Sequence, residues 1–210
     1  MHLVVGLGNP GPEYQENRHN LGFKVVDELL ARARRLPPGM APRAKFGAEI
    51  GEVTIAGERV LLCKPMEFMN VSGQAVARVA GFWKVPVGEL IVVHDELDLP
   101  FGRLKLGTGG GHGGHNGIRS LLADLGDAGF ARVRVGVGRP TPGHDPANYL
   151  LSNFSRAEAK ELPDLIGTAA DAIEAIVNGG LTAAMNKFNG KGQDSQKDNQ
   201  KDDKKDGGRA

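Results

Sequence analysis

The segment HLVVGLGNPG, residues 2–11, joins an apolar run to a loop of glycine and proline. An unbroken apolar run ending in glycine is typical of a strand covered on both faces, so we expect a buried strand at residues 2–7. Asn9 follows just beyond its carboxyl end. Open α/β sheets bind their ligands at this edge. The segment therefore predicts a buried strand of an α/β sheet, with a polar side chain at the edge where sites form.

The rest of the chain alternates between helical and strand patterns. Apolar residues at helical spacing predict helices at residues 19–35, 76–83, 118–125 and, from a capping box at Ser155 and Glu158 with a break at Gly179-Gly180, 155–188. Strand patterns occupy residues 46–55, 58–63, 90–93, 103–106 and 131–138. The turn at Ala56-Gly57 predicts a hairpin, so we expect an α/β fold with one mixed sheet, flanked by helices on both faces.

Composition and length indicate one globular domain. The chain has 210 residues, 40% apolar and 24% charged, and we see no repeat and no second core. We expect residues 1–189 to form this domain. Residues 190–210 contain no apolar side chain before the terminal Ala210, so we expect a disordered charged tail. The net charge of +1 gives no hint of a nucleic-acid partner, which would need a local basic patch.

Cysteine content and the N-terminus bear on the compartment. Cys63 is the single cysteine, which excludes an internal disulfide and a zinc site built from several thiolates. The first residues lack the pattern of a signal peptide, and no apolar run is long enough to cross a membrane. We therefore expect a cytoplasmic protein without a membrane partner.

The glycines at residues 6, 8 and 11 match the G-x-G-x-x-G pattern of dinucleotide-binding proteins. That fingerprint needs a helix starting on the glycines and an acid at the end of a second strand. Pro10 and Pro12 intervene here, and Asp27 and Glu28 fall inside the predicted helix instead. A tight turn that requires glycine torsions explains part of the pattern and makes a dinucleotide site the weaker interpretation.

Two further polar clusters lie near strand ends. His19 stands in Arg18-His19-Asn20 at a helix start, and Asp95 follows the most apolar run. Together they suggest a His–Asp pair, in which the carboxylate fixes the tautomer of the ring and raises its basicity. The alternative is a capped helix with an exposed His19 and a turn rich in acids. No serine or cysteine stands in a nucleophile motif, so water is the expected nucleophile.

A glycine run at residues 109–117 contains His112 and His115. It lacks the Gly-Lys-Ser/Thr of a phosphate-binding P-loop. With His94 and Asp95 its histidines could ligate a metal, but a flexible glycine run is a poor support for ligands. So many glycines suggest backbone packed close to another surface, or a mobile lid. We expect neither a metal nor a cofactor.

Four segments in order resemble the bacterial peptidyl-tRNA hydrolases. They are GLGNPG at 6–11 with Tyr14 and RHNLG at 18–22; KPMEFMNVSG at 64–73; HDELDLP at 94–100 leading to GGGHGGHNG at 109–117; and RVGVGRP at 134–140. The resemblance covers about residues 1–188. It implies hydrolysis of the ester between a peptide and the 3′ ribose of tRNA, which recycles tRNA from stalled translation, by a monomer.

The resemblance also implies roles for individual residues. His19 would be the general base, Asp95 would hold it in its basic form, and Asn9 would distinguish a blocked peptidyl nitrogen from a free one. The peptide and the tRNA 3′ end would meet Tyr14, Phe68, Asn70 and Asn116, and tRNA phosphate would meet Lys105 and Arg134. Strand alternation independently places Arg132 and Arg134 opposite the valine face, which suits phosphate contacts or a solvated strand face alike.

Two positions depart from the family pattern. Glu67 replaces a usual threonine, and its charge would weaken tRNA binding if it faced the channel. Lys105 is followed by Leu106-Gly107-Thr108, so one expected basic residue is missing.

Other functions remain open at this point. The oxyanion donor could be the side-chain amide of Asn9, Asn70 or Asn116, or N–H groups of the glycine run. The alternatives are a metal-dependent hydrolase that uses His94, Asp95, His112 and His115, and a non-catalytic protein that binds tRNA or the ribosome.

Overall fold

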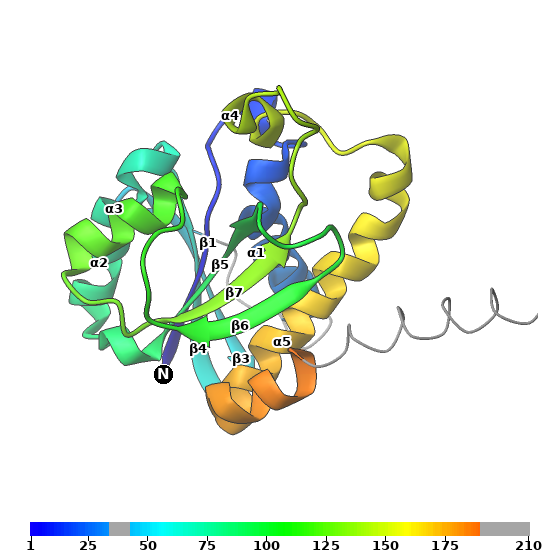
Figure 1. Ribbon diagram of the computed structural model, residues 1–210. Coiled ribbons are helices and arrows are strands. Elements are labelled where there is room, and N and C mark those ends of the chain that lie inside the picture. Colours follow the sequence, from blue (N-terminus) through cyan, green and yellow to red (C-terminus); the bar gives the residue numbers. More distant parts are fainter. Residues whose placement is uncertain (34–42, 190–210) are drawn as a thin grey trace, which may run out of the picture.

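The computed structural model describes residues 1–33 and 43–189, which share one seven-stranded mixed sheet (Figure 1). The strands are β1 (His2–Gly6), β2 (Arg43–Lys45), β3 (Ala48–Ile55), β4 (Glu58–Pro65), β5 (Leu90–Glu96), β6 (Leu104–Thr108) and β7 (Ala131–Gly136), in the spatial order β2-β3-β4-β1-β5-β7-β6. The four strands β4, β1, β5 and β7 are parallel, while β2, β3 and β6 run antiparallel to their neighbours. The predicted fold class is confirmed.

Helices cover both faces of the sheet, as expected. They are α1 (Leu21–Ala33), α2 (Ser72–Trp83), α3 (Asn116–Leu125), α4 (Pro146–Leu150) and α5 (Arg156–Phe188), with short 3-10 helices η1 (Pro12–Tyr14), η2 (Arg18–Asn20), η3 (Met69–Val71) and η4 (Val87–Glu89). Figure 1 shows α1 and α5 on one side of the sheet and α2 and α3 on the other. Successive residues of β1 alternate between these two apolar layers: Val4 packs with α1 and α5, and Leu3 and Val5 pack with α2 and α3.

The central strand β1 positions the site. It pairs in parallel with β4 on one side and β5 on the other, which explains why its apolar run is unbroken. Gly6 and Gly22 allow α1 to cross close to this strand. A Cβ built on Gly6 would lie 2.2 Å from the Gly22 oxygen, so any side chain there would push the helix away.

Several predicted boundaries move. The helix expected from residue 19 begins as η2, and α1 starts only at Leu21. The strand expected at 90–93 continues as β5 to Glu96, because His94, Asp95 and Glu96 pair with β7. The capping box at Ser155 and the break at Gly180, with φ of 81°, are both present.

Some predictions concern residues outside the described ranges. They are the disordered tail at 190–210 and the last residues of the helix predicted at 19–35, and both stay predictions. Within the described part, no helix is at once long and apolar enough to span a membrane.

Candidate active site

A pocket opens at the carboxyl ends of β1 and β5, as the polar clusters of the sequence predicted. Its wall includes six of the nine proposed site residues, namely Asn9, His19, Phe68, Asn70, Asp95 and Asn116. Residues of α4 and the turn before it close one side. Tyr14 stands outside this lining, with its ring edge-on to Phe68 at 6.5 Å between centroids. Lys105 of β6 and Arg134 of β7 are also outside this lining, and Arg134 pairs with His94 of β5.

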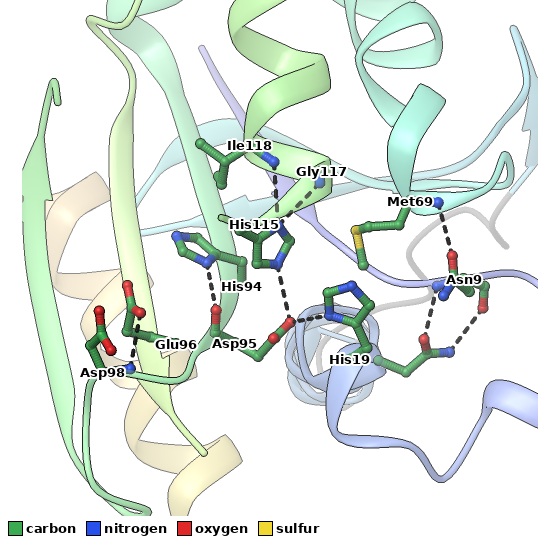
Figure 2. Close-up of polar contacts among 11 residues, drawn as sticks. Asn9, His19, Met69, His94, Asp95, Glu96, Asp98, His115, Gly117 and Ile118 are labelled. Carbon is green, nitrogen blue, oxygen red and sulfur yellow. Dashed lines mark hydrogen bonds and ion pairs between the residues drawn. The ribbon is translucent and has the colours of Figure 1, made fainter. Parts of the chain in front are cut away.

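His19 and Asp95 form the predicted pair. The Nδ1 atom of His19 lies 2.9 Å from Oδ1 of Asp95, and the two residues are only 7% and 2% exposed (Figure 2). The alternative of an exposed His19 beside a capped helix is therefore wrong. Because Nδ1 donates to the carboxylate, the second ring nitrogen, Nε2, is left as the basic atom of a residue that lines the pocket.

A third residue, His115, completes this arrangement. Its Nδ1 accepts the backbone N–H groups of Gly117 and Ile118 at 3.1 and 3.3 Å and so caps the N-terminus of α3. A ring nitrogen that accepts hydrogen bonds carries no proton, so the proton of a neutral His115 resides on Nε2. That Nε2–H donates to the same Oδ1 of Asp95, at 3.1 Å (Figure 2).

The electrostatics follow from this geometry. Burial by itself would raise the pKa of the Asp95 carboxyl, yet its contacts with His19 and His115 hold that pKa well below the usual range. Burial would lower the pKa of His19, but the Asp95 carboxylate outweighs it and raises that pKa. The site therefore holds a buried carboxylate that favours positive charge on His19.

Asn9 is fixed on three sides. The Asn20 side chain accepts the Asn9 backbone N–H at 2.8 Å and donates to the Asn9 carbonyl at 2.9 Å. The Oδ1 atom of Asn9 accepts the Met69 N–H at 2.8 Å (Figure 2). Its Nδ2 group has no partner among residues 1–33 and 43–189, which leaves a rigidly held donor in the lining of the pocket. The side chain of Asn20 thus holds the backbone of Asn9, the residue just beyond β1.

The four residues of the metal alternative do not converge. His94 is fully buried, with Nδ1 on the Asp95 carbonyl at 2.7 Å, and burial lowers its pKa to about 3. His112 is exposed and accepts the Gly114 N–H. Ligand atoms of His19, Asp95 and His115 do lie within 4.8 Å of one another. However, His115 caps α3 through Nδ1 and carries its proton on Nε2. To bind an ion through Nε2, a neutral His115 would have to move that proton to Nδ1, which could then no longer accept the hydrogen bonds that cap α3.

The two basic residues proposed for tRNA are neighbours. Lys105 of β6 is directly paired with Arg134 of β7. Within residues 1–33 and 43–189 neither side chain has a carboxylate partner. Lys105 is exposed and Arg134 is half-buried, and two adjacent cations without such partners are suited to a phosphate group.

Arg132 does not make the phosphate contact that strand alternation suggested. Its side chain is 2% exposed and donates to the carbonyls of Gly110 and Gly111, at 2.9 and 2.6 Å. The guanidinium stacks over Phe130 at 4.8 Å. Arg132 therefore holds the glycine run against the sheet, upstream of His115.

Arg18 has a structural role that the sequence did not reveal. Its guanidinium contacts the Ser152 and Asn153 carbonyls and Glu158, the last at 2.7 Å, and stacks on Tyr149 at 4.2 Å. These groups follow or belong to α4, so the residue beside His19 anchors the segment that closes the pocket. The RHN motif hinted at a site, but only the distant partners at 149–158 define this contact.

Glu67 turns away from the pocket. Its carboxylate pairs with Arg78 at 2.5 Å, and Glu67 is absent from the lining to which Phe68, Met69 and Asn70 contribute. Its negative charge therefore does not face the channel, and the weakening of tRNA binding expected for that orientation does not follow.

Comparisons with known proteins agree on one family. A family model described as "Peptidyl-tRNA hydrolase" matches residues 3–199. A peptidyl-tRNA hydrolase of Geobacter metallireducens is 49% identical over 189 residues, covering 90% of this chain and 95% of that protein. One of Kineococcus radiotolerans is 50% identical over 194 residues, covering 89% and 96%. The crystal structure of peptidyl-tRNA hydrolase from Acinetobacter baumannii superimposes with a TM-score of 0.82 at 36% identity, covering 90% of this chain and 95% of that one.

Proposed function

The chain belongs to the peptidyl-tRNA hydrolase family and hydrolyses peptidyl-tRNA, and from that premise we propose how its residues cleave the ester. His19 is the general base, and its Nε2 takes a proton from a water molecule in the pocket. The water oxygen attacks the ester carbonyl carbon, and the carbonyl oxygen becomes an oxyanion. When the intermediate collapses, the bond from carbon to the ribose oxygen breaks, and His19 returns the proton to that oxygen.

Asp95 and His115 support this cycle without touching substrate. The Asp95 carboxylate stabilises the imidazolium that exists after water is deprotonated, because the Nδ1–H of His19 points at it. His115 is a positioning residue: tied to the backbone of α3, it fixes the carboxylate through its second hydrogen bond. The arrangement of His19, Asp95 and His115 is the observation that carries the proposal.

Asn9 selects the blocked substrate. Its Nδ2 group is a donor in the pocket wall, and its other polar groups are occupied. An N-acylated residue presents a carbonyl that accepts this bond, whereas the ammonium group of a free aminoacyl ester has only donors to offer. Tyr14, Phe68, Asn70 and Asn116 contact the peptide and the tRNA 3′ end, and Lys105 with Arg134 binds a tRNA phosphate. The enzyme acts as a cytoplasmic monomer without metal or cofactor.

Release of the N-acetyl amino acid from N-acetyl-aminoacyl-tRNA tests the mechanism, with free aminoacyl-tRNA as the control substrate. Wild type should cleave only the blocked substrate, with or without EDTA. His19→Ala should lose at least about 100-fold in rate, the usual contribution of a general base, and keep its fold by circular dichroism. Turnover of the variant within tenfold of wild type, or loss of activity with chelator, would contradict it.

A further inference from the structure

Four large apolar side chains are exposed in the described part of the chain, and two of them line the pocket. Among the described residues they are Met66, Phe68, Phe82 and Leu151, exposed by 43 to 57%. Phe68 and Leu151 line the pocket itself. Met66 and Phe82 do not, and the proposed mechanism gives them no role. Exposed apolar groups that cluster indicate an interaction surface, whereas scattered ones need no explanation.

Phe82 belongs to an aromatic platform formed by Phe46, Phe82, Trp83 and Lys45. The Phe46 and Phe82 rings lie 4.9 Å apart, and Trp83 is 6.1 Å from Phe46 and 4.7 Å from Phe82. The Lys45 ammonium stands 3.7 Å from the Phe82 ring centre and 4.7 Å from that of Phe46. The platform thus offers ring faces and edges together with one cation.

The platform is continuous with the pocket. The Met66 N–H donates to the Gly47 carbonyl at 2.8 Å, which ties the turn that carries Phe46 to the loop that carries Phe68. Arg78 reinforces this link, because its Nε donates to the Phe46 carbonyl and its terminal nitrogen contacts Glu67. Glu67, the departure from the family pattern, therefore helps to join the platform to the pocket mouth.

Phe46 occupies an unfavourable backbone position. It lies with Gly47 in the two-residue turn between β2 and β3, and both have positive φ, 57° and 75°. Such turns favour Asn-Gly, and a bulky residue with positive φ is an outlier. Ala56 and Gly57 have the same pair of positive φ angles, so the backbone is that of an ordinary two-residue hairpin turn, and only the bulky side chain of Phe46 is unusual there.

We propose that the aromatic platform binds the nascent peptide of the substrate, upstream of its C-terminal residue, and favours apolar side chains. This inference rests on the proposed function, because the direction of the substrate across the sheet follows from the proposed binding of tRNA phosphate by Lys105 and Arg134. Lys105 and Arg134 lie on the β7 and β6 side of the ester site, and the platform lies on the β4 and β3 side. With tRNA phosphate on the first side, the peptide leaves toward the second.

The span also fits. The platform turn begins β3, two strands from β1, which corresponds to roughly 10 Å at the usual strand spacing. An extended chain covers that distance with about three residues. The platform therefore acts on peptides of about four residues or more and does not affect a single blocked residue.

The test compares three substrates on the same tRNA with the same C-terminal residue: an N-acetyl-aminoacyl ester, a six-residue peptide with apolar upstream residues, and one with serine and glycine upstream. Wild type should show kcat/KM about 5- to 10-fold higher for the apolar peptide, the size of effect that one buried aromatic contact supplies. Phe82→Ala should remove this gain and leave the N-acetyl substrate unchanged. Phe82→Leu should retain part of the preference for the apolar peptide. Lys84→Ala, a control at a neighbouring surface position, should retain the whole preference.

Further variants and readouts keep the inference open to refutation. Phe46→Asn suits the turn and should also remove the gain, with its folding checked by thermal melting. Inhibition by deacylated tRNA should be the same for wild type and Phe82→Ala. Weaker inhibition of the variant, or equal losses on all three substrates, would assign the platform to tRNA bases and overturn the proposal. The proposal would also be overturned if wild type cleaved the apolar and the serine and glycine peptides with equal kcat/KM. It would be overturned too if wild type self-associated in solution and Phe82→Ala were a monomer, because the platform would then be an interface between copies of the chain.

Binding separates this inference from the catalytic mechanism. In a His19→Ala background the uncleaved apolar peptidyl-tRNA should bind about 5- to 10-fold more tightly than the serine and glycine substrate. That difference persists if His19 is not the base and vanishes if the platform does not bind peptide.

Discussion

Replacing Asp95 with asparagine tests the centre of the mechanism. Asparagine has the same shape, so its Oδ1 can still accept from both histidines, but the charge is gone. The form of His19 that acts as the base is neutral in the ground state, so the loss of the Asp95 charge removes little substrate binding. In the transition state His19 becomes an imidazolium beside a buried neutral amide, so the loss should appear in kcat and leave KM nearly unchanged.

The magnitude follows from the distance. Nδ1 and Oδ1 are 2.9 Å apart, which places the centres of the two charges roughly 4 Å apart. At an effective dielectric constant of about 20, unit charges at that separation attract by about 4 kcal/mol. Since about 1.4 kcal/mol corresponds to a tenfold rate, Asp95→Asn should lower kcat by about 1,000-fold.

The assay is the pH dependence of kcat/KM on N-acetyl-aminoacyl-tRNA. Asp95 raises the pKa of His19 against the effect of burial, so wild-type activity should fall as the pH drops through a value above the ordinary histidine pKa. In Asp95→Asn only burial acts on the pKa of His19 and lowers it, so the acid limb of the kcat/KM profile should move to lower pH while its plateau value falls. Asp98→Asn, an exposed acid nearby, should leave both unchanged. A variant within tenfold of wild type, or a limb that stays in place, would refute the reasoning.

Three other predictions concern residues around this pair. His115→Asn can still cap α3 but offers Asp95 a poorer contact, so kcat should fall about 10- to 100-fold and the acid limb of the pH profile should shift. His115→Ala should in addition lose about 1 kcal/mol of stability in urea melts, because the cap is gone. An unchanged kcat in both variants would exclude a positioning role. His94 stays neutral in the fold down to about pH 3 while the unfolded chain takes up a proton below about pH 6.5, so stability should fall by up to about 1.4 kcal/mol per pH unit within that window. His94→Phe should lose this dependence, and equal slopes for both proteins would contradict the assignment. Arg134→Ala and Lys105→Ala should each reduce the slope of log tRNA affinity against log salt by about one, and an unaltered slope would mean that neither contacts phosphate.

Local patterns predicted most of the fold. The run before Gly6 is unbroken because β1 is covered on both faces, and Ser155 and Glu158 form the capping box that their spacing indicates. The turn at Ala56-Gly57 has positive φ at both residues, as a two-residue hairpin requires. Each of these signals depends on residues adjacent in sequence, so no knowledge of distant partners was needed.

The roles of individual polar residues were harder to predict because they depend on distant contacts. Alternation assigned Arg132 and Arg134 to one face, but it cannot tell a face open to water from one covered by a loop, and the glycine run covers Arg132. His115 lies in a glycine run without periodicity, so nothing in the local sequence indicates that its ring caps α3 and reaches Asp95. The pairing of His19 with Asp95 was predictable because the helix start that carries His19 follows β1, and Asp95 lies near the carboxyl end of the neighbouring strand β5.

The glycine pattern at residues 6–11 shows why fold and site cannot be separated in this protein. A Cβ on Gly6 would meet the Gly22 carbonyl, and one on Gly8 would lie 2.7 Å from the Phe23 ring, so both glycines are required by α1 and not by a dinucleotide. The same close crossing brings the Asn20 side chain, at the end of η2, within hydrogen-bond distance of the Asn9 backbone. Because His19 precedes Asn20, the spacing of β1 and α1 also sets where the proposed base stands. A methyl group at Gly6 should therefore displace the base as well as destabilise the fold.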